Sequence, residues 1–343
     1  MKRVFWLDAA RAIAIILVVF THAHERAGIQ NEMLRSIFYS IDRLGVPLFF
    51  MISGGLILPK LANCDLLSFY KKRIPQFIIL AVFWCVITNS VSNYTDGIGV
   101  FESLKNALVN NNGLYPSDFG GASHIWFMYI MIQLYIIAPF LAKMLNNSSN
   151  KEIVVFLSLC VLFNQFKFTA SSLVGGDWGA LYRMGADLTG SYLVFFVLGY
   201  LIIERKVWSG KTIKYFTSYA LIVIVPVVLL VLVDRSNGKL NDDMHWYGGS
   251  LFIVISSIGL MLVIKWLFED SNNRILSFIS KCSFGIYLSH YSFIYIFQVI
   301  MKGRLSGLSE IQLMMAYFTF SFFAGLLFTS VMMRTKITKY LVA

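Results

Sequence analysis

The chain has 343 residues, of which 57% are hydrophobic and 16% aromatic, while only 14% carry a charge. A soluble domain is about 25% charged, so this composition excludes an ordinary soluble protein and predicts an all-α, polytopic transmembrane bundle. The net charge of +11 is explained by membrane topology, so the expected partner is membrane lipid and not nucleic acid.

Ten apolar segments are predicted to cross the membrane, and together they make a single membrane domain over residues 1–343. They lie near Phe5–Ala23, Leu44–Pro59, Ile74–Val91, His124–Leu141, Glu152–Phe168, Leu188–Ile203, Tyr215–Val233, Gly249–Phe268, Phe284–Met301 and Gln312–Met333. The second is short and contains Gly54 and Gly55. We therefore expect it to be tilted, broken or extended upstream.

The basic residues are distributed unequally between the two sides of this topology. With the N-terminus in the cytoplasm, 18 of the 29 Lys and Arg residues fall inside, 10 fall outside, and Arg11 lies within the first segment. Cytoplasmic loops carry such an excess of basic residues in membrane proteins. Both termini are therefore predicted to be cytoplasmic. The four cysteines show no CxxC pair or metal-like spacing, so neither a disulfide framework nor a metal site is expected.

The first segment, WLDAARAIAIILVVFTHAH, combines a spanning length with four polar residues, Asp8, Arg11, His22 and His24. A charge in a spanning helix costs at least a few kcal/mol, so it usually faces the protein interior or a wet cavity. Arg11 and His22 return to the same helix face after a rise of about 16 Å. Because charges interrupt its start and no small-residue cleavage site follows, we interpret it as a retained span rather than a signal peptide.

Two residues of this segment are candidates for chemistry. A neutral imidazole at His22 could remove a proton from an alcohol or carry an acyl group itself; the alternative is a structural histidine. Arg11 keeps its charge, so it could contact an anionic or carbonyl-bearing ligand. Alternatively, Arg11 forms an ion pair with Asp8. This ion pair is compatible with a contact between Arg11 and a ligand.

The predicted inner loop before the third segment carries the basic run Lys71, Lys72 and Arg73. Such a cluster could hold the phosphates of a nucleotide-like cofactor. The alternative is that these charges only set the topology.

Two later segments carry further polar candidates. His124 and Trp126 open the fourth segment from the outside, which predicts His124 at a height similar to His22. Tyr287 and His290 lie one helical turn apart in the ninth segment. These four residues are candidates for substrate contact or support, and the alternative for each is a polar residue of the core.

The outer loops near Thr169–Asp187 and Asp234–Gly248 are rich in aromatic residues. They carry Trp178, Tyr182, His245, Trp246 and Tyr247. Aromatic and acidic residues occur together where sugars are bound, and they also form interfacial belts. Both interpretations stay open, with the belt favoured.

Five stretches, taken in order, resemble the motifs of the acyltransferase-3 family of integral-membrane acyltransferases, which includes O-antigen and enterobacterial common antigen O-acetyltransferases. They are WLDAARAIAIILVVFTHAH, GVPLFFMISG, FYKKRIPQFIILAVFW, HIWFMYIMIQLYIIAPFL and SFGIYLSH. The first contains an Arg and a His separated by ten residues, here Arg11 and His22. The similarity covers essentially the whole chain, and five motifs in order are specific although each is weak alone.

This resemblance implies an acyl-coenzyme A donor, usually acetyl-CoA, on the cytoplasmic side. The implied acceptor is a hydroxyl of a cell-surface or lipid-linked glycan on the outer side of a bacterial inner (plasma) membrane. Arg11 and His22 would be the essential residues, and the inner basic loop would bind the donor through Arg73. Gln76 stands where the family has a second Arg, and Lys72 is the substitute that we expect. With no hydrolase-like domain after the last segment, the membrane part is expected to act alone or with a partner.

A transporter or flippase for lipid-linked sugars is the competing prediction, since intramembrane charges also mark substrate pathways. Transporters often show internal inverted repeats. We find no repeat at a fixed period, which favours the enzyme.

Overall fold

The computed structural model describes residues 4–109, 120–175, 190–304 and 307–342, and within them the chain is helical with no strand. The predicted all-α polytopic fold is confirmed, but the number of spans differs. Eight helices in these ranges are long and apolar enough to cross a membrane. They are Phe5–Ala27, Glu32–Leu61, Leu66–Thr95, Gly120–Asn146, Asn150–Val174, Ile213–Asn237, Leu251–Phe268 and Glu310–Met332.

The two remaining predicted spans are helical but do not meet this measure. The sixth is the shorter apolar helix Leu193–Glu204. The ninth is a helix of 27 residues, Arg274–Ile300, in which tyrosine, serine and histidine side chains lower the mean hydropathy. This helix carries two of the predicted site residues, Tyr287 and His290.

The second span is extended upstream, as the sequence suggested. Helix α2 (Glu32–Asp42) leads through a short turn into α3 (Gly45–Leu61), and together they make one apolar stretch of 30 residues. The two glycines do not break α3. They allow α10 (Leu193–Gly199) to approach α3 closely.

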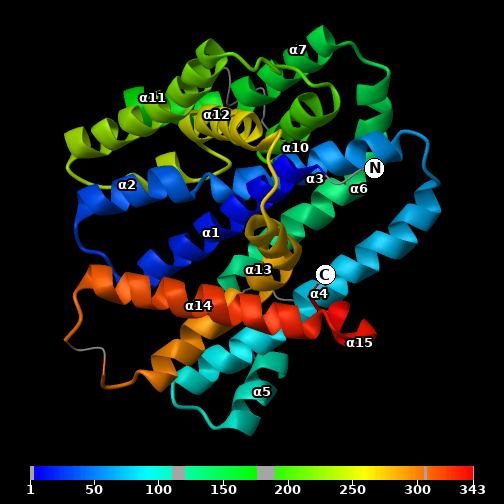
Figure 1. Ribbon diagram of the computed structural model, residues 1–343. Coiled ribbons are helices and arrows are strands. Elements are labelled where there is room, and N and C mark those ends of the chain that lie inside the picture. Colours follow the sequence, from blue (N-terminus) through cyan, green and yellow to red (C-terminus); the bar gives the residue numbers. More distant parts are fainter. Residues whose placement is uncertain (1–3, 110–119, 176–189, 305–306, 343) are drawn as a thin grey trace. The chain divides into compact units, whose positions relative to one another are not determined.

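The chain divides into two compact units, and helices α1, α6 and α13 contribute residues to both. Unit 1 comprises residues 1–18, 30–64 and 137–280, and unit 2 comprises residues 19–29, 65–136 and 281–343. Figure 1 labels the helices along the chain. The shared helices are α1 (Phe5–Ala27), α6 (Trp126–Asn146) and α13 (Arg274–Ile300).

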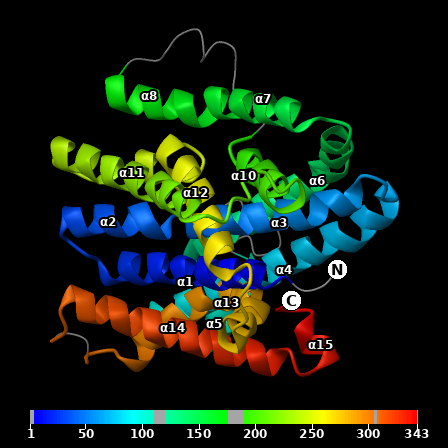
Figure 2. The ribbon, with the colours of Figure 1, turned by 45° about the horizontal axis from the view of Figure 1, so that its top comes forward.

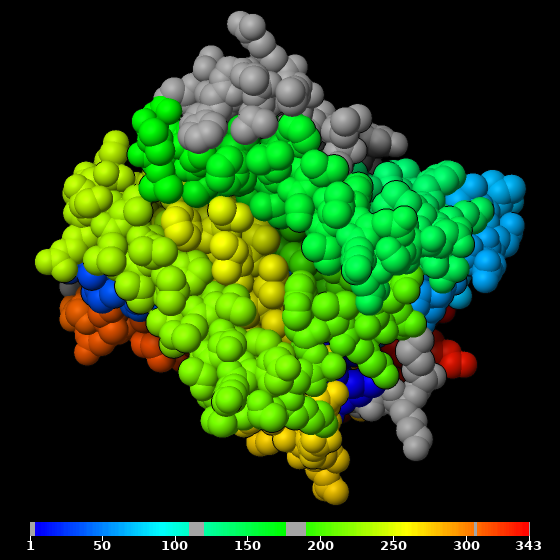
Figure 3. Space-filling view, turned by 90° about the horizontal axis from the view of Figure 1, so that it is seen from above, coloured from blue at the N-terminus to red at the C-terminus, as the bar shows by residue number. Residues whose placement is uncertain are grey.

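Unit 1 holds most of the apolar helices. Besides α2, α3 and α10 it contains the α-helices α7 (Asn150–Val161), α8 (Lys167–Val174), α11 (Ile213–Asn237) and α12 (Leu251–Phe268). It also contains two short π-helices, η2 (Leu162–Phe166) and η3 (Tyr200–Glu204), and the short 3-10 helix η4 (Asp242–His245). Helices α11 and α12 lie side by side (Figure 2). Atoms of α12 (yellow) are visible at the surface between green and yellow-green segments of the same unit (Figure 3). Only 22% of the most apolar window of α11 is buried, which suits a helix with a large lipid-facing surface.

Unit 2 is built on α4 and α13. It also contains α5 (Val100–Val109), η1 (Gly120–Ile125), α14 (Glu310–Met332) and α15 (Lys336–Lys339), besides α4 (Leu66–Thr95). The indole of Trp84 on α4 donates to the carbonyl oxygen of Leu341 at 2.8 Å, which ties the C-terminal turn to α4. Tyr295 of α13 donates to the carbonyl oxygen of Gly121 at 2.8 Å. This bond fixes η1, which carries His124, against α13.

Candidate active site

The last turn of α1 carries a histidine–carboxylate pair. The distance from His22 Nδ1 to Glu25 Oε2 is 2.8 Å, and the two residues are three apart, so their side chains share one helix face. Because a carboxylate only accepts, Nδ1 is the nitrogen that carries the hydrogen. In the neutral imidazole, Nε2 of His22 is then the nitrogen that carries the lone pair. The His22 side chain is 13% exposed and that of Glu25 27%, so solutes can reach the pair.

Three histidine rings and one tyrosine ring from three segments meet at this point in unit 2. The ring of His22 lies 5.3 Å from that of His290 and 4.7 Å from that of Tyr291. The ring of His124 lies 5.1 Å from that of His290 and stacks on Tyr291 at 4.6 Å. We call His22, Glu25, His124, His290 and Tyr291 the histidine cluster.

Hydrogen bonds to backbone carbonyls fix the tautomers of the two deeper rings. His290 Nδ1 lies 2.6 Å from the carbonyl oxygen of Tyr287, and His124 Nε2 lies 3.3 Å from that of Leu288. A carbonyl oxygen accepts, so each of these nitrogens donates. The other nitrogens, His290 Nε2 and His124 Nδ1, are buried without a hydrogen-bond partner among the described residues. Each therefore offers a lone pair inside the protein, and a second proton there would find no acceptor.

Two further bonds hold η1 and α13 in register around the cluster. The hydroxyl of Tyr287 donates to the carbonyl oxygen of His124 at 2.8 Å. The Ser123 hydroxyl donates to the Tyr291 oxygen at 3.1 Å. Positioning from several elements is what an active site needs to hold a reactive geometry.

The structure brings together three of the predicted histidines and Tyr287. Trp126 lies two residues beyond His124 and packs its ring on Phe127 at 6.3 Å. His24 is buried with its ring 5.8 Å from that of Phe20, so it packs in the protein core. The rings of His22 and His124 both contact the ring of Tyr291, and their similar height in the membrane stays a prediction.

Asp8 and Arg11 belong to unit 1. The Ser280 hydroxyl donates to Asp8 Oδ1 at 2.8 Å, and Asp8 is buried. Arg11 is half-buried on the same continuous helix that carries His22. Roles for both residues stay predictions.

The basic run lies on the first turns of α4, in unit 2. Lys71 and Lys72 are exposed and Arg73 is half-buried, with its Nη1 donating to Gln76 Oε1 at 3.4 Å. On the same turns Phe69 stacks on Tyr135 of α6 with the ring centres 6.1 Å apart. The aromatic face of this turn is thus packed, and the basic side chains are left to solvent or ligand.

Sequence reasoning missed two members of the cluster. Glu25 had a local signal, because a carboxylate three residues after a histidine on a helix lies beside it. Tyr291 had none, since its contact with His22 depends on how α13 packs against α1. Although three histidines gather here, no group of His, Cys, Asp or Glu in the described part of the chain is arranged to hold a metal ion.

The fold and the cluster define a multi-pass membrane protein with a histidine–carboxylate pair of the kind used in acyl transfer. The chain belongs to the acyltransferase-3 family, whose acyltransferase domain matches residues 4–334. This confirms the family resemblance.

Curated relatives agree with this assignment. Two proteins from Staphylococcus aureus, of strains COL and MSSA476, are each named "Putative O-acetyltransferase" and are 24% identical over 326 and 320 residues, covering 86% and 84% of this chain. The chain spans about half the length of these relatives, 51% and 50%. A Caenorhabditis elegans protein, "Regulator of hypoxia-inducible factor 1", is 19% identical over 391 residues, covering 94% of this chain and 77% of its own length. No solved structure matches the chain.

Trp178 and Tyr182 of the predicted outer loops lie outside the described residues.

Proposed function

We propose that this protein is an O-acyltransferase that moves an acyl group, most simply acetyl, from cytoplasmic acyl-CoA to a hydroxyl of a cell-surface or lipid-linked glycan. The observation that carries the proposal is the His22–Glu25 pair in the histidine cluster. Family membership supports acyl transfer as the reaction. The donor, the acceptor and a place in a bacterial plasma membrane are our inference.

The His22–Glu25 pair has the arrangement of a general base with an orienting carboxylate. In direct transfer, Nε2 of His22 takes the proton from the acceptor hydroxyl while the oxygen attacks the thioester carbonyl. The carbon–sulfur bond then breaks, and the coenzyme A sulfur leaves with the proton from His22. The products are an ester and a free thiol. Glu25 stabilises the imidazolium that exists between the two proton transfers.

A second route uses the same lone pair as the nucleophile. Nε2 of His22 would attack the thioester, the carbon–sulfur bond would break, and coenzyme A would leave as its thiolate, which gives an N-acyl-imidazolium. The acceptor oxygen would then take the acyl group as the carbon–nitrogen bond breaks, and the hydroxyl proton would pass to the thiolate or to water, so that His22 returns to its neutral form. The two routes differ in one observable. Purified enzyme incubated with donor labelled in the acyl group, without acceptor, becomes labelled only by the covalent route.

We assign donor binding to the start of α4, and a contact of Arg11 with the donor stays a prediction from the sequence. Coenzyme A carries phosphates, and Lys71, Lys72 and Arg73 present three positive charges on adjacent positions. Charge-assisted hydrogen bonds to phosphate are strong, and arginine makes them in pairs. The predicted topology places this turn on the cytoplasmic side, where acyl-CoA is available.

Arg73→Ala is expected to raise the KM for acyl-CoA about tenfold and to leave kcat within about twofold, because it removes ground-state binding far from the reacting carbonyl. Steady-state kinetics with varied donor measures this, and the matched control is Lys143→Ala, a lysine predicted to lie on the same side. An unchanged KM for acyl-CoA in Arg73→Ala would contradict the proposal that the donor phosphates bind at the start of α4.

The proposed function is tested in cells with and without the gene. Mass spectrometry of surface glycans is expected to show acylated hydroxyls that disappear on deletion and return on complementation. Glycan export is measured in the same cells. Loss of export with acylation intact on the remaining glycan would favour the transporter prediction.

A further inference from the structure

We propose that unit 1 contains a saccharide-binding pocket around Trp246, which takes a neutral sugar ring of the acceptor glycan. The proposal rests on the proposed function for the identity of the ligand as an acceptor. Its geometry is independent of the histidine cluster, because the pocket is formed wholly by unit 1.

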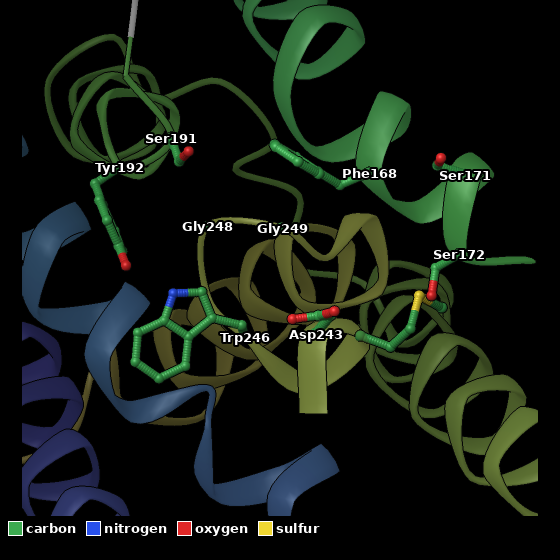
Figure 4. Close-up of a pocket in the computed structure, with 10 residues that line it drawn as sticks. Phe168, Ser171, Ser172, Ser191, Tyr192, Asp243, Trp246, Gly248 and Gly249 are labelled. Atoms are coloured by element: carbon green, nitrogen blue, oxygen red, sulfur yellow. The ribbon is translucent and has the colours of Figure 1, made fainter. Parts of the chain in front are cut away.

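Three segments of unit 1 surround the pocket: the end of α8, the residues before α10 and the connection between α11 and α12. Its main lining residues are Phe168, Ser172, Ser191, Tyr192, Asp243 and Trp246. Figure 4 shows these side chains around the open space, with the indole of Trp246 below Tyr192 and the carboxylate of Asp243 beside it. The cavity volume is about 510 Å³, within the range of small-molecule sites.

The lining has the chemistry of a sugar site. A pyranose ring presents an apolar face of C–H groups and a rim of hydroxyls. Aromatic rings offer flat apolar surfaces for the face, and Trp246 and Phe168 keep 43% and 44% of their surface exposed. The serine hydroxyls and the Asp243 carboxylate can bond the rim, and a bond to an ionised acceptor is stronger than a neutral one.

Other cavities of the molecule differ in chemistry, which argues for the kind of ligand. Among the described residues, no Lys or Arg lines the Trp246 pocket, and the Asp243 carboxylate would repel a phosphate. A cavity of unit 2 is lined instead by Arg26 and Lys302. A groove of unit 1 is lined mainly by aliphatic side chains such as Leu157 and Val254, which suits a lipid chain. The Trp246 pocket is therefore best suited to a neutral, hydroxyl-rich ligand.

Trp246 is held in place from two sides. Its indole N–H donates to the Tyr192 hydroxyl. The Arg43 guanidinium lies 5.6 Å from the Trp246 ring centre and donates to the Tyr247 hydroxyl at 2.9 Å. A rigid aromatic loses little freedom on binding, which favours affinity.

The loop that carries Trp246 is clamped by a buried carboxylate. Asp234 accepts hydrogen bonds from the Ser36 hydroxyl at 2.6 Å, from His245 Nε2 at 2.6 Å and from the Asn241 backbone N–H at 3.1 Å. At the far end of the loop the Thr169 hydroxyl donates to the Gly249 carbonyl at 3.2 Å. The pocket is thus preorganised by the packing of unit 1.

A close approach of backbone shapes one wall. A Cβ on Gly248 would lie 2.8 Å from the Ser191 Cβ, so a larger residue there would push the two walls apart. The helix ends that form the pocket lie at loops that the charge distribution predicts to be on the outer side of the membrane. That is the side where a surface glycan is available.

The test measures binding without acyl transfer. Full-length protein in phosphatidylcholine nanodiscs is mixed with the methyl β-glycosides of glucose, galactose and N-acetylglucosamine, and saturation-transfer NMR detects ring C–H protons in contact with the protein. We expect at least one glycoside to be saturated. Trp246→Ala is expected to weaken this binding about tenfold, and Asp243→Asn, an exposed change that leaves the fold intact, about threefold.

Trp208→Ala is the matched control, because Trp208 has the same exposed fraction of 43% and does not line this pocket. Saturation that is equal in the wild type and Trp246→Ala would overturn the proposal. Saturation of sn-glycerol 3-phosphate in place of the glycosides would also overturn it and indicate a lipid headgroup site.

The outcome is separable from the proposed function. His22→Ala is expected to bind glycosides as the wild type does, since His22 is not part of the pocket. If the wild type binds glycosides at Trp246 but transfers no acyl group, the proposed function fails and the pocket stands. If it transfers acyl groups and Trp246→Ala leaves the acceptor KM unchanged, the pocket proposal fails alone.

Discussion

His22→Ala is expected to lower kcat for acyl transfer by about 10³-fold or more, because it removes the lone pair that takes the acceptor proton. Purified protein is assayed with acetyl-CoA and an acceptor glycan, and release of free coenzyme A thiol gives the rate. Acyl transfer at the wild-type rate in this variant would show that the His22 imidazole takes no part in the reaction. In cells, acylation that persists in the His22→Ala strain while glycan export fails would favour the transporter prediction.

Glu25→Gln is the companion variant, and it is expected to lower kcat about 10²-fold to 10⁴-fold. The glutamine amide can donate to Nδ1, which favours the tautomer with the hydrogen on Nε2. The base is then absent although the ring is still held in place. Glu25→Asp should recover part of the rate, because it keeps an acceptor near Nδ1.

His24→Gln is the matched control on the same turn of α1. Its ring packs on Phe20 at 5.8 Å, away from the His22–Glu25 bond, so a folded His24→Gln protein should keep its rate. A loss in His24→Gln equal to that in Glu25→Gln would mean that α1 has been disturbed and that the pair has no specific role.

Each histidine was a candidate because it stands in or beside an apolar segment, where a polar residue suggests a hypothesis of function. Their assembly was only partly predictable. The spacing placed His22 and His124 at similar heights, but the contact of His290 and Tyr291 with His22 depends on the rotation of α13 about its axis. Periodicity gives the face of one helix and does not give the partner of that face.

The partner of Asp8 and the role of the aromatic outer loop could not be predicted from the sequence. An ion pair of Asp8 with Arg11 was one alternative from the sequence, because the two are one turn apart, and it stays a prediction. The hydrogen bond that the Ser280 hydroxyl donates to Asp8 joins residues 272 apart in the chain, so no local pattern predicts it. Similarly, the aromatic outer loop fitted both a sugar site and an interfacial belt. Only the tertiary structure shows that Trp246 lines a pocket with Asp243, and that distinction is what makes the saccharide proposal testable.

The glycines of the second span were read as a possible break, and the structure gives them another role. A Cβ on Gly54 would lie 1.9 Å from the Phe196 carbonyl oxygen, and a Cβ on Gly199 would lie 1.8 Å from that of Met51. The backbones of α3 and α10 are therefore in direct contact. Small residues allow such approach between membrane helices, where packing and not the hydrophobic effect drives association.

Gly199→Ala is expected to destabilise the protein by about 3 kcal/mol, the upper end of the usual cost of overpacking, because the Met51 carbonyl is backbone and cannot rotate away. The thermal unfolding midpoint of the purified protein measures the effect, together with the yield of folded protein. Gly325→Ala is the matched control, since its Cβ would meet only ordinary contacts at 3.5 Å from Ile286 Cγ2 and Ser289 Oγ. Alanine favours a helix over glycine by about 1 kcal/mol, so this control should be neutral or slightly stabilising. Equal midpoints for the two variants would show that α3 and α10 can separate at no cost, and the close backbone contact would then not be what holds unit 1 together.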